Sequence, residues 1–93
     1  MIVSFKDKET EKIFNQEFSK KLPVDIQIIA FRKLQRLDRF LSLKDLAKIP
    51  GNNLEKLKGR ENSWSIRINK QWRIVFKVNE NNDFEDVEIV DYH

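Results

Sequence analysis

Two stretches in which side-chain type alternates strictly constrain the fold of this chain more than any other feature. In residues 64–69 and 71–78, apolar side chains occupy every second position and mostly polar ones lie between them. A period of two indicates β-strands with one buried face. The apolar faces coincide only if Ile68 lies opposite Trp72, which predicts an antiparallel hairpin with Asn69-Lys70-Gln71 as its turn.

The same register places Arg67 directly opposite Arg73. Like charges that face each other across a sheet are destabilising, and an anion bound between them would remove that cost. Alternatively, the two long side chains splay apart into solvent at little cost. The sequence leaves both interpretations open.

Helical spacing dominates the first half of the chain. Residues 8–18 predict a helix with Ile13, Phe14 and Phe18 on one side. A longer helix is expected to begin near Pro23 and Asp25, because proline fits the first turn and an acidic residue suits the positive end. Its predicted core face holds Ile26, Ile29, Ala30, Leu34, Leu37 and Leu41. The opposite side carries Arg32, Arg36 and Arg39, which form a solvated face or bind phosphate or an acidic partner.

Turn residues and short apolar runs mark the remaining elements. Pro50-Gly51-Asn52-Asn53 is a turn cluster at the change from helices to strands. Further strands are predicted at residues 2–5, at 54–57 and from about 86 to 92. A chain of 93 residues has room for one hydrophobic core, so we expect a single domain over residues 1–93.

Composition narrows the class of protein. Zero cysteines exclude a disulfide framework and a thiolate metal site, and they fit a reducing cytoplasm. A single histidine makes a structural zinc site improbable. The start of the sequence, Met1 to Phe5, is too short and too soon followed by polar residues for a signal peptide, and no apolar run reaches the ~20 residues of a membrane span. We therefore expect a cytoplasmic protein without a membrane segment.

The net charge of +3 conceals a strong segregation. All 18 Lys and Arg lie within residues 1–77, whereas residues 79–93 carry six acidic residues and no basic one. The basic body favours a polyanionic partner, because phosphate contacts are electrostatic and independent of nucleotide sequence. Alternatively, the acidic segment pairs beside basic strands and neutralises them, and the two interpretations are compatible.

The last three residues, Asp91-Tyr92-His93, include the only tyrosine and the only histidine of the sequence. Together with Arg67 and Arg73 they supply what metal-free RNA cleavage needs: a base for the 2′-hydroxyl, an acid for the departing 5′-oxygen, and cations for the developing charge. His93 would be the acid or base, since imidazole exchanges a proton near neutral pH, and the two arginines would hold the phosphate. Tyr92 would stack on a nucleobase, and Asp91 would orient the imidazole or a nearby cation. The alternative is a strand end that frays.

A regular strand would not bring these three side chains together. Alternation places Asp91 and His93 on one face, continuous with the apolar Val87 and Ile89, and Tyr92 on the other. They converge only if the strand twists, bulges or ends before Tyr92.

In combination, these segments resemble the HigB toxins of the RelE/ParE superfamily, which belong to type II toxin–antitoxin systems. The similar segments are Leu57-Lys58-Gly59, Trp64 to Asn69, Gln71-Trp72-Arg73-Ile74 and Asp91-Tyr92-His93. Met1 to Phe5 and Arg32-Lys33-Leu34 with Leu37-Asp38 also fit, so the resemblance covers nearly the whole chain.

This resemblance implies an α+β fold in which two N-terminal helices pack on a small, mostly antiparallel, twisted sheet. It implies an endoribonuclease that cleaves mRNA in the ribosomal A site, with no metal or other cofactor. It also implies neutralisation by a HigA-type antitoxin with a helix-turn-helix domain, through which the complex would bind operator DNA. Carried over residue by residue, Arg73 would bind the scissile phosphate and Lys58 would contact RNA or phosphate. Asp91, Tyr92 and His93 would form the catalytic terminus.

The chain departs from some relatives just before the Leu-Lys-Gly segment. Those relatives carry a second histidine there, whereas this sequence has Glu55 and Lys56. A two-histidine mechanism is therefore absent, and Glu55 would serve as the base while Lys56 or Lys58 supports the developing charge. Because carboxylates are weak bases for a hydroxyl, slower cleavage than in a two-histidine relative is expected.

Two other functions are compatible with the same residues. A ParE-like protein would inhibit DNA gyrase without cutting RNA, and it would not need the imidazole of His93. A decayed toxin would bind RNA or an antitoxin without arresting growth.

Overall fold

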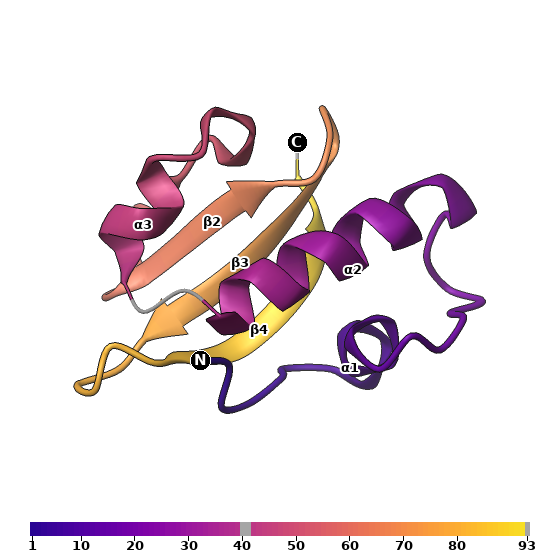
Figure 1. Cartoon of the computed structure of the whole chain (residues 1–93), viewed down its shortest axis with the longest axis horizontal. Helices are drawn as coiled ribbons and strands as arrows, with labels where there is room; N and C mark the ends of the chain where they lie inside the picture. The colour runs from indigo at the N-terminus through magenta and orange to yellow at the C-terminus, as the bar shows by residue number, and fades with distance from the viewer. Residues whose placement is uncertain (40–41, 93) are drawn as a thin grey trace.

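Helices occupy the first half of the chain and strands the second half in the computed structural model, which describes residues 1–39 and 42–92 (Figure 1). In chain order the elements are α1 (Lys8–Phe14), α2 (Val24–Arg39), α3 (Leu43–Ala47), the 3₁₀ helix η1 (Pro50–Asn52), β1 (Glu55–Lys56), β2 (Ser63–Arg67), β3 (Trp72–Val78) and β4 (Phe84–Asp91). The strands form one antiparallel sheet in the order β1-β2-β3-β4. The predicted α+β fold is therefore confirmed. Two residues singled out in the sequence, Leu41 and His93, lie outside the described residues.

The hairpin of β2 and β3 has the predicted register. Ile68 N donates a hydrogen bond to Trp72 O at 2.9 Å, which closes the turn where the alternation placed it. Arg67 is the direct partner of Arg73. Because the predicted register is correct, the predicted pairing of the two arginines is confirmed as well.

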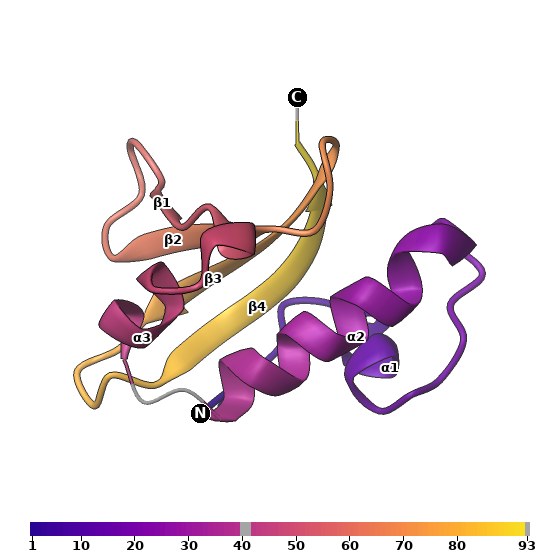
Figure 2. The ribbon, with the colours of Figure 1, turned by 45° about the horizontal axis from the view of Figure 1, so that its top comes forward.

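One face of the sheet is covered by helices and the other is open. Figure 2 shows α1 and α2 on the same side of β3 and β4, and among residues 1–39 and 42–92 no helix covers the opposite side. The covered face carries the core, in which the rings of Phe76 and Phe84 pack edge to face with centroids 4.9 Å apart. From α2 the core receives Ile26, Ala30, Leu34 and Leu37. Nowhere in the described chain is a helix sufficiently long and apolar to cross a bilayer.

The predicted end of the first helix and one predicted core position were wrong. α1 ends at Phe14 because Asn15 caps it and Gln16 takes a left-handed backbone with φ of 61°. Phe18, which was expected on that helix, consequently lies outside it and is 62% exposed. Ile29 is 40% exposed, because it sits about 100° around α2 from the fully buried Ala30 and falls at the border of the apolar stripe.

Short elements differ most from the sequence prediction. Residues 2–5 do not form a strand; Ile2 and Phe5 make isolated parallel bridges to Phe84 and Val87 of β4. The short helix α3 was not predicted, although Ser42 caps it by accepting a hydrogen bond from Asp45 N at 3.4 Å. The strand predicted at residues 54–57 is confined to Glu55–Lys56, and β4 begins at Phe84, two positions before its expected start.

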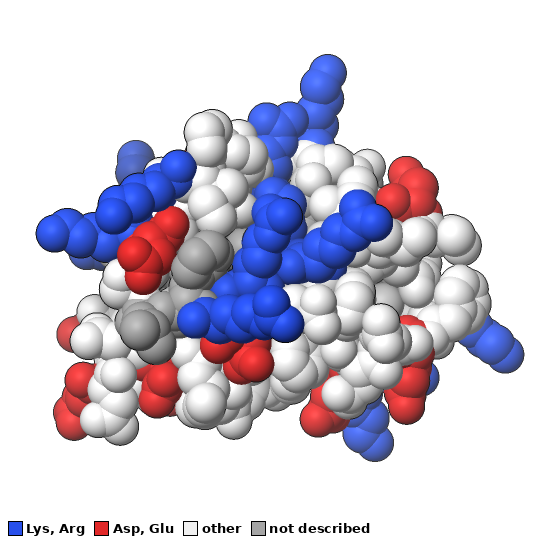
Figure 3. Space-filling model, viewed as in Figure 1, with Lys and Arg blue, Asp and Glu red and all other residues white. Residues whose placement is uncertain are grey.

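The acidic end of the chain lies beside basic segments, as one of the two charge interpretations predicted. Glu85 of β4 is the register partner of Lys77 in β3. Glu88 forms ion pairs with Lys6 and Arg60 at 3.8 and 3.9 Å. Basic side chains nevertheless gather on the helical face, where Figure 3 shows Lys and Arg across the middle of the surface. Arg32, Arg36 and Arg39 are exposed there.

A partly buried hydrogen bond ties α1 to the segment that leads into α2. The hydroxyl of Ser19 donates to Glu9 Oε1 at 2.6 Å. This hydrogen bond is the main reason that the pKa of Glu9 lies below its ordinary value; burial opposes it, and the positive charges of Lys12 and Lys21 add to it. Because the folded state has the lower pKa, the associated stabilisation is complete above the ordinary value of about 4.3 and is lost as the pH falls through the lowered value.

Ser19→Ala should therefore lower the free energy of unfolding more near pH 7 than at an acidic pH below the lowered pKa, where Glu9 is protonated in both states. Urea unfolding at the two pH values measures the difference. In a Glu9→Gln background the pH-dependent part of the effect should vanish. An effect of Ser19→Ala that is the same at both pH values would contradict this assignment.

Candidate active site

Arg73 is held by groups from three neighbouring segments on the open face of the sheet. It lies on β3 and is 8% exposed. Its Nε donates a hydrogen bond to Ser65 Oγ at 2.9 Å, and its Nη2 donates to the carbonyl of Asn53 at 2.6 Å. Its Nη1 lies 4.0 Å from Glu55 Oε1. A buried charge requires such partners, and together they fix the guanidinium in one orientation.

The carbonyl of Asn53 reaches Arg73 because of the turn that precedes β1. Asn53 directly follows η1 and has a left-handed backbone with φ of 43°, a conformation that asparagine tolerates better than most residues. Lys33 of α2 holds the same turn, since its Nζ donates to the carbonyl of Gly51 at 3.0 Å and to Asn52 Oδ1 at 3.3 Å. Through Lys33, α2 thus supports the turn whose Asn53 carbonyl accepts a hydrogen bond from Arg73.

Tyr92 lies against the guanidinium of Arg73. Its backbone N donates to Gln71 O at 2.6 Å, which holds the segment after β4 beside the turn of the hairpin. The ring centroid lies 5.5 Å from Arg73 Cζ, a cation–π distance. The side chain is 42% exposed, so an aromatic surface is available next to a fixed cation.

The second arginine, Arg67, faces Arg73 across the hairpin and donates from its Nε to Asn69 O at 3.1 Å. Both arginines line a cavity of about 430 Å³. Its lining residues are Asn53, Leu54, Glu55, Arg67, Asn69, Lys70, Arg73 and Tyr92. Cations outnumber carboxylates in this lining, which favours an anion.

Positive charge at this end of the sheet also acts on Lys33. Burial lowers the pKa of Lys33, and the charges of Arg36, Arg67 and Arg73 lower it further. The repulsion among these cations is what a bound anion would relieve.

The three predicted residues at and after β1, Glu55, Lys56 and Lys58, all line one cavity but have different neighbours. Glu55 pairs with Ser65 and so shares the open face with Arg73. Lys56 pairs with Trp64, and its ammonium lies 6.0 Å from the centroid of that ring, on the opposite side of the strand. Lys58 is exposed in the loop before β2 and lines a second cavity of about 630 Å³, together with Glu55 and Tyr92.

Asp91 and Tyr92 diverge, as the alternation along the strand predicted. Asp91 is the register partner of Trp72, and its Oδ2 accepts a hydrogen bond from Gln71 Nε2 at 3.1 Å. Tyr92 lies beside Arg73 instead. Of the predicted site residues, the structure therefore brings together Arg67, Arg73, Glu55 and Tyr92. His93 is outside the described residues.

Two of the groups that hold Arg73 were missed by the sequence analysis. Ser65 is fully buried on β2, and the hairpin register makes it a diagonal neighbour of Arg73, so the pairing contained a signal for it. The carbonyl of Asn53 left no such signal, because a backbone atom carries no residue-specific information. Within residues 1–39 and 42–92, no cluster of three His, Cys, Asp or Glu side chains could hold a metal ion.

The arrangement can bind and orient a phosphate. The planar guanidinium can donate two hydrogen bonds to two oxygens of one phosphate, and a guanidinium already fixed by its own neighbours loses little entropy on binding. An exposed aromatic ring beside it provides a stacking surface for an unpaired base. A carboxylate, Glu55, lies at the same cavity and can accept a proton.

Comparison with known proteins identifies the family of the chain. Residues 3–93 match the model of the RelE-like toxin of type II toxin–antitoxin system HigB. The chain is 40% identical to Toxin HigB-1 of Vibrio cholerae serotype O1 over 79 residues, which are 83% of either chain. It is 37% identical to an uncharacterized protein of Haemophilus influenzae over 68 residues, 72% of this chain and 66% of that protein. The chain therefore belongs to the HigB family of RelE-like toxins from type II toxin–antitoxin systems.

Proposed function

We propose that this toxin is an endoribonuclease that cleaves mRNA in the ribosomal A site. The observation that carries the proposal is the guanidinium of Arg73, which is fixed by Ser65 and Asn53 and lies against the exposed ring of Tyr92. This pair offers one group for a phosphate and one for a base, in a cavity rich in positive charge. Single-stranded RNA presents both a phosphate and an unpaired base.

Arg73 would act on the scissile phosphate. Its Nε and Nη2 donate to protein atoms and its Nη1 lies 4.0 Å from Glu55 Oε1, while the residue lines the cavity that Arg67 shares, so N–H groups remain for a phosphate. Charge develops on the non-bridging oxygens as the 2′-oxygen forms its bond to phosphorus and the bond to the 5′-oxygen breaks. Fixed cations stabilise that charge without reorganisation, which is the largest contribution that such a site can make.

Two protons must move in this reaction. One leaves the 2′-hydroxyl as the oxygen attacks, and one reaches the departing 5′-oxygen. We assign His93 to one of these transfers, because imidazole is the side chain suited to both directions near neutral pH. Glu55 would make the other transfer, which its place in the lining of the cavity of Arg73 supports, and Lys58, in the neighbouring cavity, would support the developing charge.

The ribosome would supply the alignment that so small an enzyme lacks. In-line geometry is worth several kcal/mol of the barrier when something other than solvent imposes it. The exposed arginines of α2 offer a docking surface for ribosomal RNA. Naked RNA at neutral pH should accordingly be cut at least about 100-fold more slowly than the same RNA held in a ribosome. Equal rates on the two substrates would reject the dependence on the ribosome.

A toxin of a type II system has an antitoxin partner. We assign to it a HigA-type protein with a helix-turn-helix domain, which would carry any binding of the complex to operator DNA. The site of toxin action would be the cytoplasm, where ribosomes and mRNA are found.

The proposal is tested by following macromolecular synthesis after induction of the toxin in growing cells. A ribonuclease of this type stops the incorporation of labelled amino acids first and leaves plasmid supercoiling intact. The His93→Ala variant should not affect either quantity. Early loss of supercoiling by both proteins would instead indicate a gyrase inhibitor, and no growth arrest by the wild type would indicate a protein that only binds its partner.

A further inference from the structure

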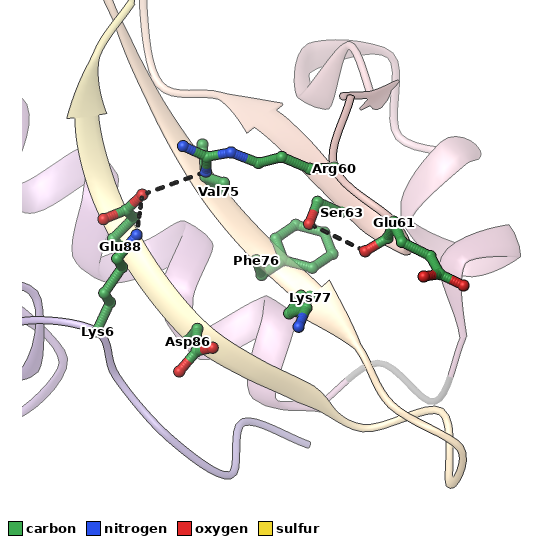
Figure 4. A pocket seen from close by; sticks show the side chains of 9 residues that line it. All are labelled: Lys6, Arg60, Glu61, Ser63, Val75, Phe76, Lys77, Asp86 and Glu88. Carbon is green, nitrogen blue, oxygen red and sulfur yellow. Dashed lines mark hydrogen bonds and ion pairs between the residues drawn. The ribbon is translucent and has the colours of Figure 1, made fainter. Parts of the chain in front are cut away.

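A continuous groove runs from Arg73 along the open face of the sheet. The cavity that contains Arg73 shares Glu55 and Tyr92 with the cavity of about 630 Å³ beside it. That second cavity shares Arg60, Val75 and Glu88 with a third, of about 440 Å³ (Figure 4). The phosphate site is therefore one end of a longer binding surface, and the part around Glu88 has no role in the reaction described above.

Charge distinguishes the two ends of this groove. Around Arg73 the basic residues outnumber the acidic ones. Around Glu88 they are balanced, with Lys6, Lys77 and Arg60 opposed by Glu61, Asp86 and Glu88. The apolar side chains of Val75 and Val90 also line the groove between the two ends. A surface with an apolar floor and a few polar groups suits a neutral aromatic ligand better than it suits a phosphate.

The carboxylate of Glu88 is placed to accept hydrogen bonds. Only 15% of its side chain is exposed, and Lys6 Nζ and Arg60 Nη1 approach the same oxygen, Oε1, at 3.8 and 3.9 Å. Both contacts are longer than a hydrogen bond, so these cations stabilise the charge while leaving Oε2 outside both pairs. Figure 4 shows Lys6 and Arg60 on either side of this carboxylate.

The register between β3 and β4 places Glu88 close to the phosphate site along the groove. Val75 pairs with Glu88, and Arg73 pairs with Val90, so Glu88 lies two residues from that pair along β4. Two residues of strand span about 7 Å. This separation is one that a single nucleotide bridges between its phosphate and its base.

We propose that the Glu88 end of the groove binds the nucleobase next to the scissile phosphate and selects bases with an exocyclic amino group over uracil. This inference rests on the proposed ribonuclease function and names the base that the same site reads. Adenine, cytosine and guanine each present an amino donor on the Watson–Crick edge, to which a carboxylate is the matching acceptor. Uracil has no amino group on that edge; its one donor, N3–H, stands between two carbonyl oxygens that repel an approaching carboxylate. Arg60, on the loop before β2, can cover the face of the base.

The test uses ribosome complexes programmed with mRNAs that differ in one base beside the cleavage point. The wild type should cut the amino-bearing bases about tenfold faster than uracil at one such position. Glu88→Gln should lower this ratio to threefold or less, because the amide nitrogen donates to uracil oxygens. Glu85→Gln makes the same chemical change on the same strand, at a residue that pairs with Lys77, and should keep the wild-type ratio.

The Lys6→Ala variant distinguishes recognition of the base by Glu88 from a structural role of the Lys6–Glu88 ion pair. It removes the contact to Glu88 but leaves the carboxylate, so it should keep the discrimination. Two results would overturn the assignment of base recognition to Glu88 without affecting the ribonuclease proposal. One is a wild-type ratio of cleavage rates in Glu88→Gln, and the other is a loss of discrimination in Lys6→Ala equal to that in Glu88→Gln. Absence of cleavage by the folded wild type would reject the ribonuclease function and this inference with it.

Discussion

Arg73→Lys is expected to lower the single-turnover rate of mRNA cleavage by roughly 100-fold or more, the usual cost of removing one fixed group that stabilises transition-state charge. Lysine keeps the positive charge but has a single ammonium. It cannot bind Ser65 Oγ, the carbonyl of Asn53 and two phosphate oxygens at once, as the planar guanidinium can. The rate on ribosomes programmed with a single mRNA measures the effect.

Two further variants make this prediction specific. Ser65→Ala removes only the hydrogen bond to Arg73 Nε, so the guanidinium keeps its charge and loses part of its orientation. Its cleavage rate should fall between those of the wild type and Arg73→Lys. Lys44→Ala removes an exposed cation from α3 that lines none of the three cavities, and it should stay within about threefold of the wild type, because exposed charges contribute little. If Arg73→Lys kept the wild-type rate, Arg73 would be acting only through its charge.

His93→Ala is expected to reduce cleavage by about 10²- to 10⁴-fold, the range for loss of a general acid or base. Imidazole is the group in this sequence whose ordinary pKa lies near neutrality, and the sequence contains no other histidine. The rate should be measured from about pH 5 to pH 9, because the wild type should show a pH dependence that the variant lacks.

The binding of the variant to ribosomes provides the control for this second prediction. His93→Ala should bind the programmed ribosome as tightly as the wild type, since Arg73, Arg67 and the arginines of α2 are unchanged. Full cleavage by His93→Ala, or loss of activity that parallels loss of binding, would remove His93 from the chemistry.

Sequence reasoning predicted best where one residue determines the position of another. The two-residue period of β2 and β3 fixed their register, and with it the pairing of Arg67 with Arg73. It also predicted the divergence of Asp91 and Tyr92, since neighbouring residues on a strand point to opposite faces. These results follow from a rigid geometric rule that holds without knowledge of the tertiary structure.

The parts that were missed depend on contacts between distant segments or on backbone atoms. α1 was predicted to reach Phe18, but the backbone of Gln16 turns left-handed and Phe18 leaves the helix, which apolar spacing does not reveal. The anchoring of Arg73 by the carbonyl of Asn53 depends on how η1 places that turn against β3. Packing decides both, and no local pattern of residue types encodes it.

The measurement that tests this account most directly is a map of new mRNA 5′ ends after purified toxin is added to a programmed ribosome complex. Wild type, Arg73→Lys, His93→Ala and Lys44→Ala should be compared at equal concentration, with folding of each checked by thermal unfolding. Cuts within the A-site codon from the wild type and Lys44→Ala, and nearly none from Arg73→Lys and His93→Ala, are the predicted result. No cuts from the folded wild type, or the same cuts from all four proteins, would contradict it.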